Sequence, residues 1–115
     1  MTAGVNNPDV IDLVTHDPAT DEIVVIMIED RTWSVDPEQV DQLLRKINTY
    51  LHFIEDGDLV EHFPQAAGKP VRMQLDCNEA PTGEAEQLIE EAQQLLLSRG
   101  ITFAVNVIVN VIPRT

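Results

Sequence analysis

The sequence predicts a two-layer α/β (α+β) sandwich, in which a four-stranded mixed sheet carries both helices on one face. Two stretches have the helical spacing of apolar residues, and four others are rich in β-branched or alternating apolar residues, in the order β-β-α-β-α-β. A helical crossover joins the second strand to the third and the third to the fourth, so these pairs should be parallel if adjacent. Two right-handed crossovers running in one direction place both helices on the same face and leave the other face open.

The first two strands should form a hairpin. Residues 10–15 are rich in β-branched side chains, and residues 23–28 form an unbroken apolar run that is typical of a central strand covered on both faces. Asp17, Pro18 and Asp21 supply the turn between them. Residues 1–8 are polar and contain Gly and Pro, so we expect a flexible lead-in to a single domain over residues 1–115.

The first helix has the clearest start signal in the chain. Asp36 is a capping residue, Pro37 suits the first helical position, and Gln39 could reach back to the cap. An apolar stripe follows, and Gly57 can take the left-handed conformation that ends a helix. The expected stripe is Val40, Leu43, Leu44, Ile47, Leu51 and Ile54. One further helical turn is expected at residues 59–63, before a loop over residues 65–70.

The second half of the chain predicts a strand, a helix and a strand. Residues 71–78 alternate, with the odd-numbered side chains buried, and the second helix opens near Pro81 and ends at Gly100. Its expected stripe is Ala85, Leu88, Ile89, Ala92, Leu95 and Leu96. The last strand is expected over residues 101–112, again with its odd-numbered side chains on the buried face.

The open sheet face is the predicted binding surface. It should mix polar and branched apolar side chains, a combination that suits a partner surface. The candidate partner-binding residues are Arg72, Gln74, Asp76, Asn106, Ile108 and Asn110. The last strand is uncharged over residues 101–112, and such an edge invites pairing with another chain unless the strand lies inside the sheet or only its first half pairs. We therefore expect a homodimer that forms through this face or this edge.

The charge of the chain limits its possible partners. Among 115 residues there are 20 Asp and Glu against 7 Lys and Arg, a net charge of −13. This balance argues against nucleic acids and anionic membranes, which are bound through Lys and Arg. An acidic surface instead speeds the encounter with a basic protein. We expect a non-catalytic module that binds a basic protein or itself, and an inhibitor or immunity-like protein would fit this description.

Few residues could carry catalysis. All five glycines fall in expected loops or at helix ends, and none builds a phosphate-binding loop. Neither Ser34 nor Ser98 lies in a nucleophile elbow, and Cys77 belongs to the buried face of its strand. The sequence thus leans away from an enzyme, with no catalytic residue and no cofactor expected. A single cysteine and a start without a signal-peptide pattern favour a cytoplasmic protein.

A small metal-dependent enzyme is the alternative class. Carboxylates and an imidazole lie close together after the first helix and could bind a divalent cation. The candidate ligands are Asp56, Asp58, Glu61 and His62. Their spacing does not match a calcium-binding loop, so a solvated helix end with a glycine stop is the competing interpretation.

Two segments of the chain resemble a known bacterial family of small acidic domains of unknown function. The first runs from Asn7 to Asp12 (NPDVID), and the second from Lys46 to Gly57 (KINTYLxFIExG). The likeness continues through Phe63-Pro64 and the Gly68-Lys69 loop to about residue 100. The resemblance implies a stand-alone bacterial domain and brings no catalytic residues with it. The last strand is longer here than the resemblance implies.

Overall fold

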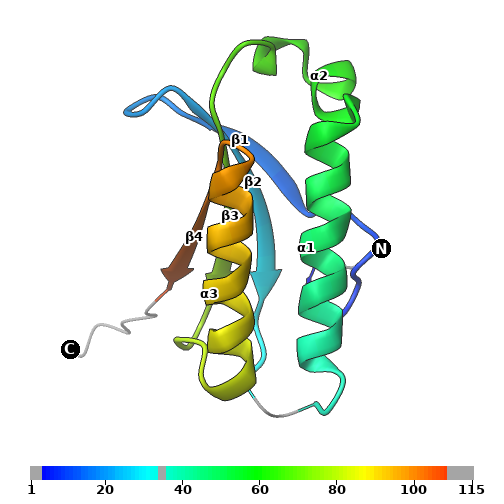
Figure 1. Ribbon diagram of the computed structural model, residues 1–115, viewed down its shortest axis with the longest axis vertical. Coiled ribbons are helices and arrows are strands. Elements are labelled where there is room, and N and C mark those ends of the chain that lie inside the picture. Colours follow the sequence, from blue (N-terminus) through cyan, green and yellow to red (C-terminus); the bar gives the residue numbers. More distant parts are fainter. Residues whose placement is uncertain (1–3, 34–35, 109–115) are drawn as a thin grey trace, which may run out of the picture.

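The computed structural model describes residues 4–33 and 36–108, which form one four-stranded sheet with helices on a single face (Figure 1). The strands follow the order β1-β2-β3-β4; β1 and β2 are antiparallel, and the other two neighbouring pairs are parallel. The strands are β1 Leu13–Asp17, β2 Glu22–Glu29, β3 Val71–Cys77 and β4 Ile101–Val107. The helices are α1 Gln39–Glu55, α2 Asp58–His62 and α3 Gly83–Ser98, with a 3-10 turn at Pro64–Ala66. The predicted α+β fold with a mixed, open sheet is confirmed.

The core lies between the sheet and the two long helices. Alternate side chains of each parallel strand point toward the helices, as the pleat of a strand requires. The fully enclosed members include Val25, Met27, Met73, Leu75, Leu43, Tyr50 and Leu96. Burying one such apolar side chain stabilises the fold by about 1.5–3 kcal/mol, so this layer holds α1 and α3 onto the sheet.

Two leucines of the expected stripes lie outside this core. Leu44 of α1 is 46 % exposed and Leu95 of α3 is 52 % exposed. Each lies next in sequence to a leucine that is completely buried, Leu43 and Leu96 respectively. Since consecutive helical residues are about 100° apart around the axis, only one member of each pair can point at the sheet.

The starts of two elements differ from the sequence prediction. β1 begins at Leu13 and not at residue 10, and α1 begins at Gln39 and not beside Pro37. Asp36 accepts the N–H of Glu38 on its carboxylate at 2.9 Å and the N–H of Gln39 on its carbonyl at 3.0 Å, while the side-chain amide of Gln39 donates to the Thr32 carbonyl at 3.2 Å. The first turn after Asp36 is not yet α-helical.

Both predicted helix ends are present. Gly57 has φ 91° and separates α1 from the short α2, and Gly100 has φ 76° directly after α3. These are left-handed conformations in which glycine lacks the steric penalty of other residues. At the other end of the fold, β4 ends at Val107, whereas the expected strand continued to residue 112. Residues 109–112 of that prediction lie outside the described part of the chain.

No helix within residues 4–33 and 36–108 has the length and apolar character needed to cross a membrane.

Candidate functional site

A row of bonded polar side chains crosses the sheet face opposite the helices. Because Met73, Leu75 and Cys77 of β3 point into the core, the alternating residues Arg72, Gln74 and Asp76 point to the open face. Asn106 of β4 is the register partner of Asp76 and lies beside it. The structure thus brings together four of the candidate partner-binding residues.

Arg72 anchors one end of this row. Its guanidinium donates to Glu22 on β2 at 2.5 Å, to Asp17 on β1 at 3.2 Å and to the Gln74 side chain at 3.2 Å. The N–H of Ala19 and the Arg72 guanidinium hold the pKa of Asp17 below its ordinary value. Arg72 therefore joins three strands through side chains and holds two carboxylates in place.

Asp76 forms the other end of the row. One of its carboxylate oxygens accepts the Gln74 amide at 2.8 Å and the Asn106 amide at 3.1 Å. Both donors are neutral, so the charge of Asp76 has no cationic partner among the described residues. We call the set Asp17, Glu22, Arg72, Gln74, Asp76 and Asn106 the polar row.

Apolar side chains accompany the polar row. Val24 and Ile26 of β2 are the register partners of Arg72 and Gln74 and are only 2 % and 7 % exposed, although none of the helices within the described residues covers this face. Leu13 on β1 is 48 % exposed, and Ile108, directly after β4, is 43 % exposed. The open face thus has a buried centre and two exposed apolar side chains near its opposite edges. Asn110, the last candidate residue for this face, lies outside the described residues.

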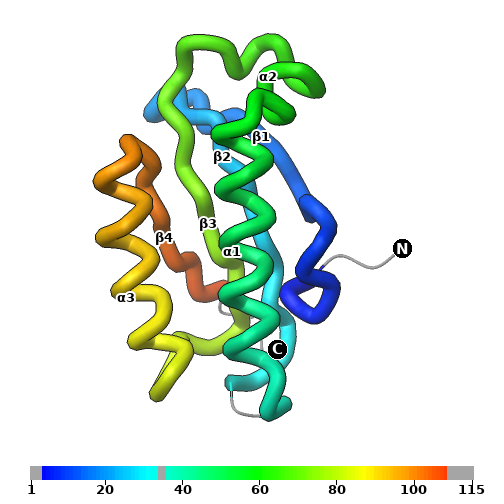
Figure 2. Tube along the Cα trace, turned by 45° about the vertical axis from the view of Figure 1, so that its right-hand side comes forward, coloured from blue at the N-terminus to red at the C-terminus, as the bar shows by residue number. Residues whose placement is uncertain are grey.

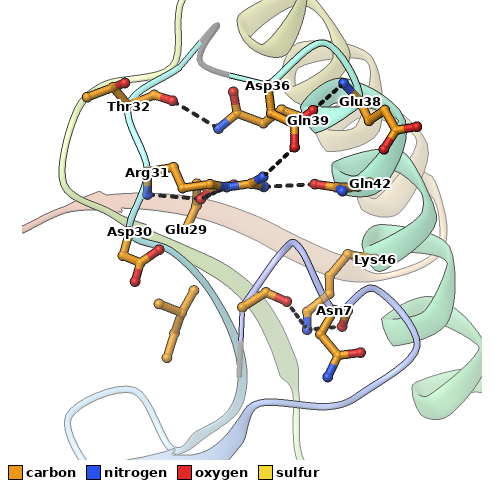
Figure 3. A network of polar contacts seen from close by, with 12 residues as sticks. Asn7, Glu29, Asp30, Arg31, Thr32, Asp36, Glu38, Gln39, Gln42 and Lys46 are labelled. Atoms are coloured by element: carbon orange, nitrogen blue, oxygen red, sulfur yellow. Dashed lines mark hydrogen bonds and ion pairs between the residues drawn. The ribbon is translucent and has the colours of Figure 1, made fainter. Parts of the chain in front are cut away.

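A second polar centre, which the sequence prediction missed, is the completely buried side chain of Lys46 on α1. The three N–H groups of its ammonium are shared by four oxygens, the carbonyls of Gly4 (2.8 Å), Asn7 (2.9 Å) and Val10 (2.8 Å) and the Asp12 carboxylate (2.7 Å). Part of this cluster is drawn in Figure 3. A buried charge is tolerated only when it is paired and hydrogen-bonded, and this ammonium meets both conditions.

Asp12 and Tyr50 connect this centre to the sheet. The Asp12 carboxylate accepts the N–H groups of Gly4 and Ile28, each at 3.0 Å. The Tyr50 hydroxyl donates to the Ile26 carbonyl at 2.6 Å and accepts the Asp12 N–H at 2.8 Å. Burial raises the pKa of Tyr50 above its ordinary value, so the phenol keeps its proton and the donor role that this geometry needs.

The N-terminal segment is held by these bonds. We expected a flexible lead-in up to residue 8, but its described part, from Gly4 onward, packs beside β2 (Figure 2). Val5 is completely buried, and its N–H donates to the Ile28 carbonyl at 2.8 Å. Residues 4–10 therefore contribute a core side chain, that of Val5, and three carbonyl ligands to the Lys46 ammonium.

A third cluster fixes the end of β2 to the start of α1. Glu29 is only 1 % exposed and binds Arg31 through both carboxylate oxygens, at 2.8 Å and 2.7 Å. Arg31 also donates to Asp36 at 3.3 Å and to Gln42 at 2.9 Å (Figure 3). The Glu29 carboxylate raises the pKa of Arg31, which remains a cation. Each charged group in this cluster already has a partner, so we assign it a structural role.

The acidic cluster after α1 is not assembled into a metal site. Asp56 lies 3.5 Å from His52, and the ring of His62 makes its 2.8 Å contact with the Asp58 carbonyl of its own helix. Within residues 4–33 and 36–108, no three or more His, Cys, Asp or Glu side chains are grouped so that they could hold a metal ion. The four candidate ligands, which include Glu61, are thus not brought together around one point.

Cys77 belongs to the core. It is 1 % exposed, and burial together with the nearby charges of Asp76 and Glu29 raises its thiol pKa to about 11. Because the thiolate is the reactive form, a thiol that keeps its proton at neutral pH is a poor nucleophile. The arrangement around Cys77 supports packing and not covalent catalysis.

The fold and the open face define a small acidic α+β domain with a preformed polar surface. The chain belongs to the family of unknown function DUF6572, whose sequence model matches residues 3–109. The resemblance to a domain family of unknown function is thereby confirmed. Searches found no matching curated protein and no matching solved structure.

Replacing Lys46 by methionine should strongly destabilise the fold. Lys46→Met leaves Asp12 buried without its cation and removes the ammonium that three backbone carbonyls bind, a change that typically costs about 3–5 kcal/mol. The measurement is the free energy of unfolding by chemical denaturation. Arg45→Met is the matched control, because Arg45 and its partner Asp9 are 63 % and 65 % exposed, and it should cost less than about 1 kcal/mol. Equal losses of unfolding free energy in the two variants would contradict the structural role of Lys46.

Cys77 should react with a thiol reagent such as DTNB only when the chain unfolds. The native thiol is buried and protonated near neutral pH, so its labelling should be far slower in buffer than in denaturant. The double variant Cys77→Ala/Ser98→Cys carries its thiol at an exposed helix position and should react at once in buffer. Labelling of native Cys77 as fast as that control would show that the strand is open to solvent.

Proposed function

We propose that this protein is a non-catalytic protein-binding module that presents its open sheet face to a basic partner. The observation that carries the proposal is that the described cations are already paired with carboxylates of the same chain. Every described Lys and Arg side chain forms an ion pair with an Asp or Glu: Arg31, Arg45, Lys46, Lys69, Arg72 and Arg99. The excess charge of the described surface is therefore carried by carboxylates, which attract a basic protein and speed its encounter.

The polar row supports the open face as the contact surface. Its side chains already hold one another by hydrogen bonds, so a partner that meets them orders few additional groups on binding. Within the chain, the Asp76 carboxylate accepts hydrogen bonds from two neutral amides. A Lys or Arg of the bound protein would supply a positive charge to pair with it. The exposed side chains of Leu13 and Ile108 add apolar contact on the two sides of the row.

Self-association through the same face is the competing possibility for this surface. Two copies would each bring a net charge of −13, so their contact should be weaker at low salt and stronger at high salt. A complex with a basic protein has the opposite dependence on salt. Light scattering after size exclusion at two salt concentrations separates the two cases, and our proposal expects the protein to be monomeric at low salt.

The open face can be tested by charge reversal at Asp76. We expect the tagged protein to capture a basic protein from a lysate of its own source at low salt and to release it at high salt. Asp76→Lys should weaken the capture by about tenfold or more, equivalent to about 1.4 kcal/mol, because it places a cation where the partner's cation binds. The matched control is Glu91→Lys, the same charge change at an exposed position on α3, in the opposite layer.

Circular dichroism should first show that both variants remain folded. The proposal fails if Asp76→Lys and Glu91→Lys capture equal amounts of the same protein, because the contact would then not involve the open face. It also fails if no basic protein is captured at low salt.

A further inference from the structure

The edge of β4 that faces away from β3 is a second surface, distinct from the open face. β4 is the last strand in the sheet order and pairs with β3 alone among the described strands. Its residues, Ile101–Val107, include no charged side chain and no proline. Charges and prolines are the usual means by which proteins stop an edge strand from pairing with another chain, and β4 has neither.

The hydrogen bonds of β4 show which backbone groups are exposed at this edge. The N–H of Ile108 donates to the Cys77 carbonyl at 2.7 Å, so Ile108 turns its backbone toward β3. In a parallel pair, alternate residues turn both their N–H and C=O toward the neighbouring strand. The odd-numbered residues of β4, among them Phe103, Val105 and Val107, therefore turn these groups away from β3.

One of these outward groups is already occupied. The side-chain amide of Gln93 on α3 donates to the Phe103 carbonyl at 3.1 Å. This bond covers the middle of the edge and leaves Val105 and Val107 as the outward residues of its second half. An added strand would therefore pair with that second half, and Gln93 would mark its limit.

A groove lies beside this part of the edge, between α3 and β4. It has a volume of about 210 Å³, and its lining includes the apolar side chains of Ile89 and Val105 and the carboxylates of Glu86 and Glu90. α3 carries four Glu and no Lys or Arg, so no cation on this helix competes for the two carboxylates. A Lys or Arg side chain suits such a groove, because its methylene stem can lie on apolar surface while its charged end reaches a carboxylate.

We propose that the β4 edge binds an extended, basic segment of a partner protein by strand addition, with alternate Lys or Arg side chains entering the α3–β4 groove. In this mode, backbone hydrogen bonds to Val105 and Val107 supply affinity, and the groove selects the side chains. The inference rests on the proposed function only in that the partner is a basic protein. It uses a different surface and different residues.

Charge favours such a segment over a second copy of this chain. An antiparallel β4–β4 pair, which keeps α3 of both copies on one face of the joined sheet, would bring the Glu86 and Glu90 carboxylates of both copies to one junction. Every described Lys and Arg is already in an ion pair, so a second copy offers no described cation to offset them. Like charges placed together at an interface oppose that pairing.

The test uses the full chain and a short synthetic peptide that alternates valine and lysine. Two N-methylated isomers of this peptide are compared. In the first, the backbone nitrogen of every valine is methylated; in the second, the backbone nitrogen of every lysine is methylated. Both isomers keep the charge, but each loses its N–H donors along one edge, because successive N–H groups of an extended strand point to opposite sides. We expect the parent peptide to bind, one isomer to retain binding and the other to bind about tenfold or more weakly.

Two further readouts place the peptide on β4. Hydrogen exchange at the Val105 and Val107 amides should slow by about tenfold or more when the peptide is saturating, because these N–H groups become bonded. Glu86→Lys/Glu90→Lys should weaken binding by about tenfold or more. Glu84→Lys/Glu91→Lys, the same charge change at exposed positions elsewhere on the same helix, should retain binding within about threefold.

Several outcomes would overturn strand addition. Failure of the parent peptide to bind, or equal binding of both N-methyl isomers, would show that backbone pairing is not used. Equal losses of peptide affinity in the two double variants would place the peptide elsewhere. So would unchanged hydrogen exchange at the Val105 and Val107 amides when the peptide is added. Protection of these amides that rises with protein concentration in the absence of peptide would assign the edge to a second copy. None of these results bears on the open face, which is tested at Asp76.

Discussion

The arrangement of the fold depends on one buried cation. The Lys46 ammonium has no exposed surface and takes three of its four oxygen partners from the backbone of residues 4–10. An ammonium removed from water needs such partners, so the N-terminal segment must fold around it. Asp12, the fourth partner, binds the N–H of Ile28 on β2, and Tyr50 spans from α1 to β2. One side chain thereby fixes three parts of the chain to one another.

This arrangement determines which surfaces remain available. With α1 and α3 on the same face, none of the described helices covers the opposite face of the sheet (Figure 1). The polar row occupies that face, where its internal hydrogen bonds satisfy Arg72 and where Val24 and Ile26 are buried beside it. The strand order also makes β4 an edge, next to an acidic helix. Both proposals follow from one property of the chain, that its described cations are paired internally while many of its carboxylates are not.

Most of the fold could be predicted from the sequence, because its signals are local. Alternation in β3 placed Met73 in the core and Arg72 on the open face, and Gly57 marked a helix end. The Lys46 centre was missed because its partners are backbone carbonyls, which carry no signal in the sequence, and because lysine is rarely buried. A signal was present, since Lys46 lies three residues after Leu43 and four before Tyr50, on the buried face of α1.

Native-state hydrogen exchange at two backbone amides tests the central role of Lys46 most directly. The N–H of Val5 is bonded to the Ile28 carbonyl, and the N–H of Asp12 to the Tyr50 hydroxyl. If the N-terminal segment is held as described, both amides should exchange only through global unfolding, at the rate of core amides in β2. Exchange of both amides as fast as in an exposed loop, while the β2 amides stay protected, would contradict the account.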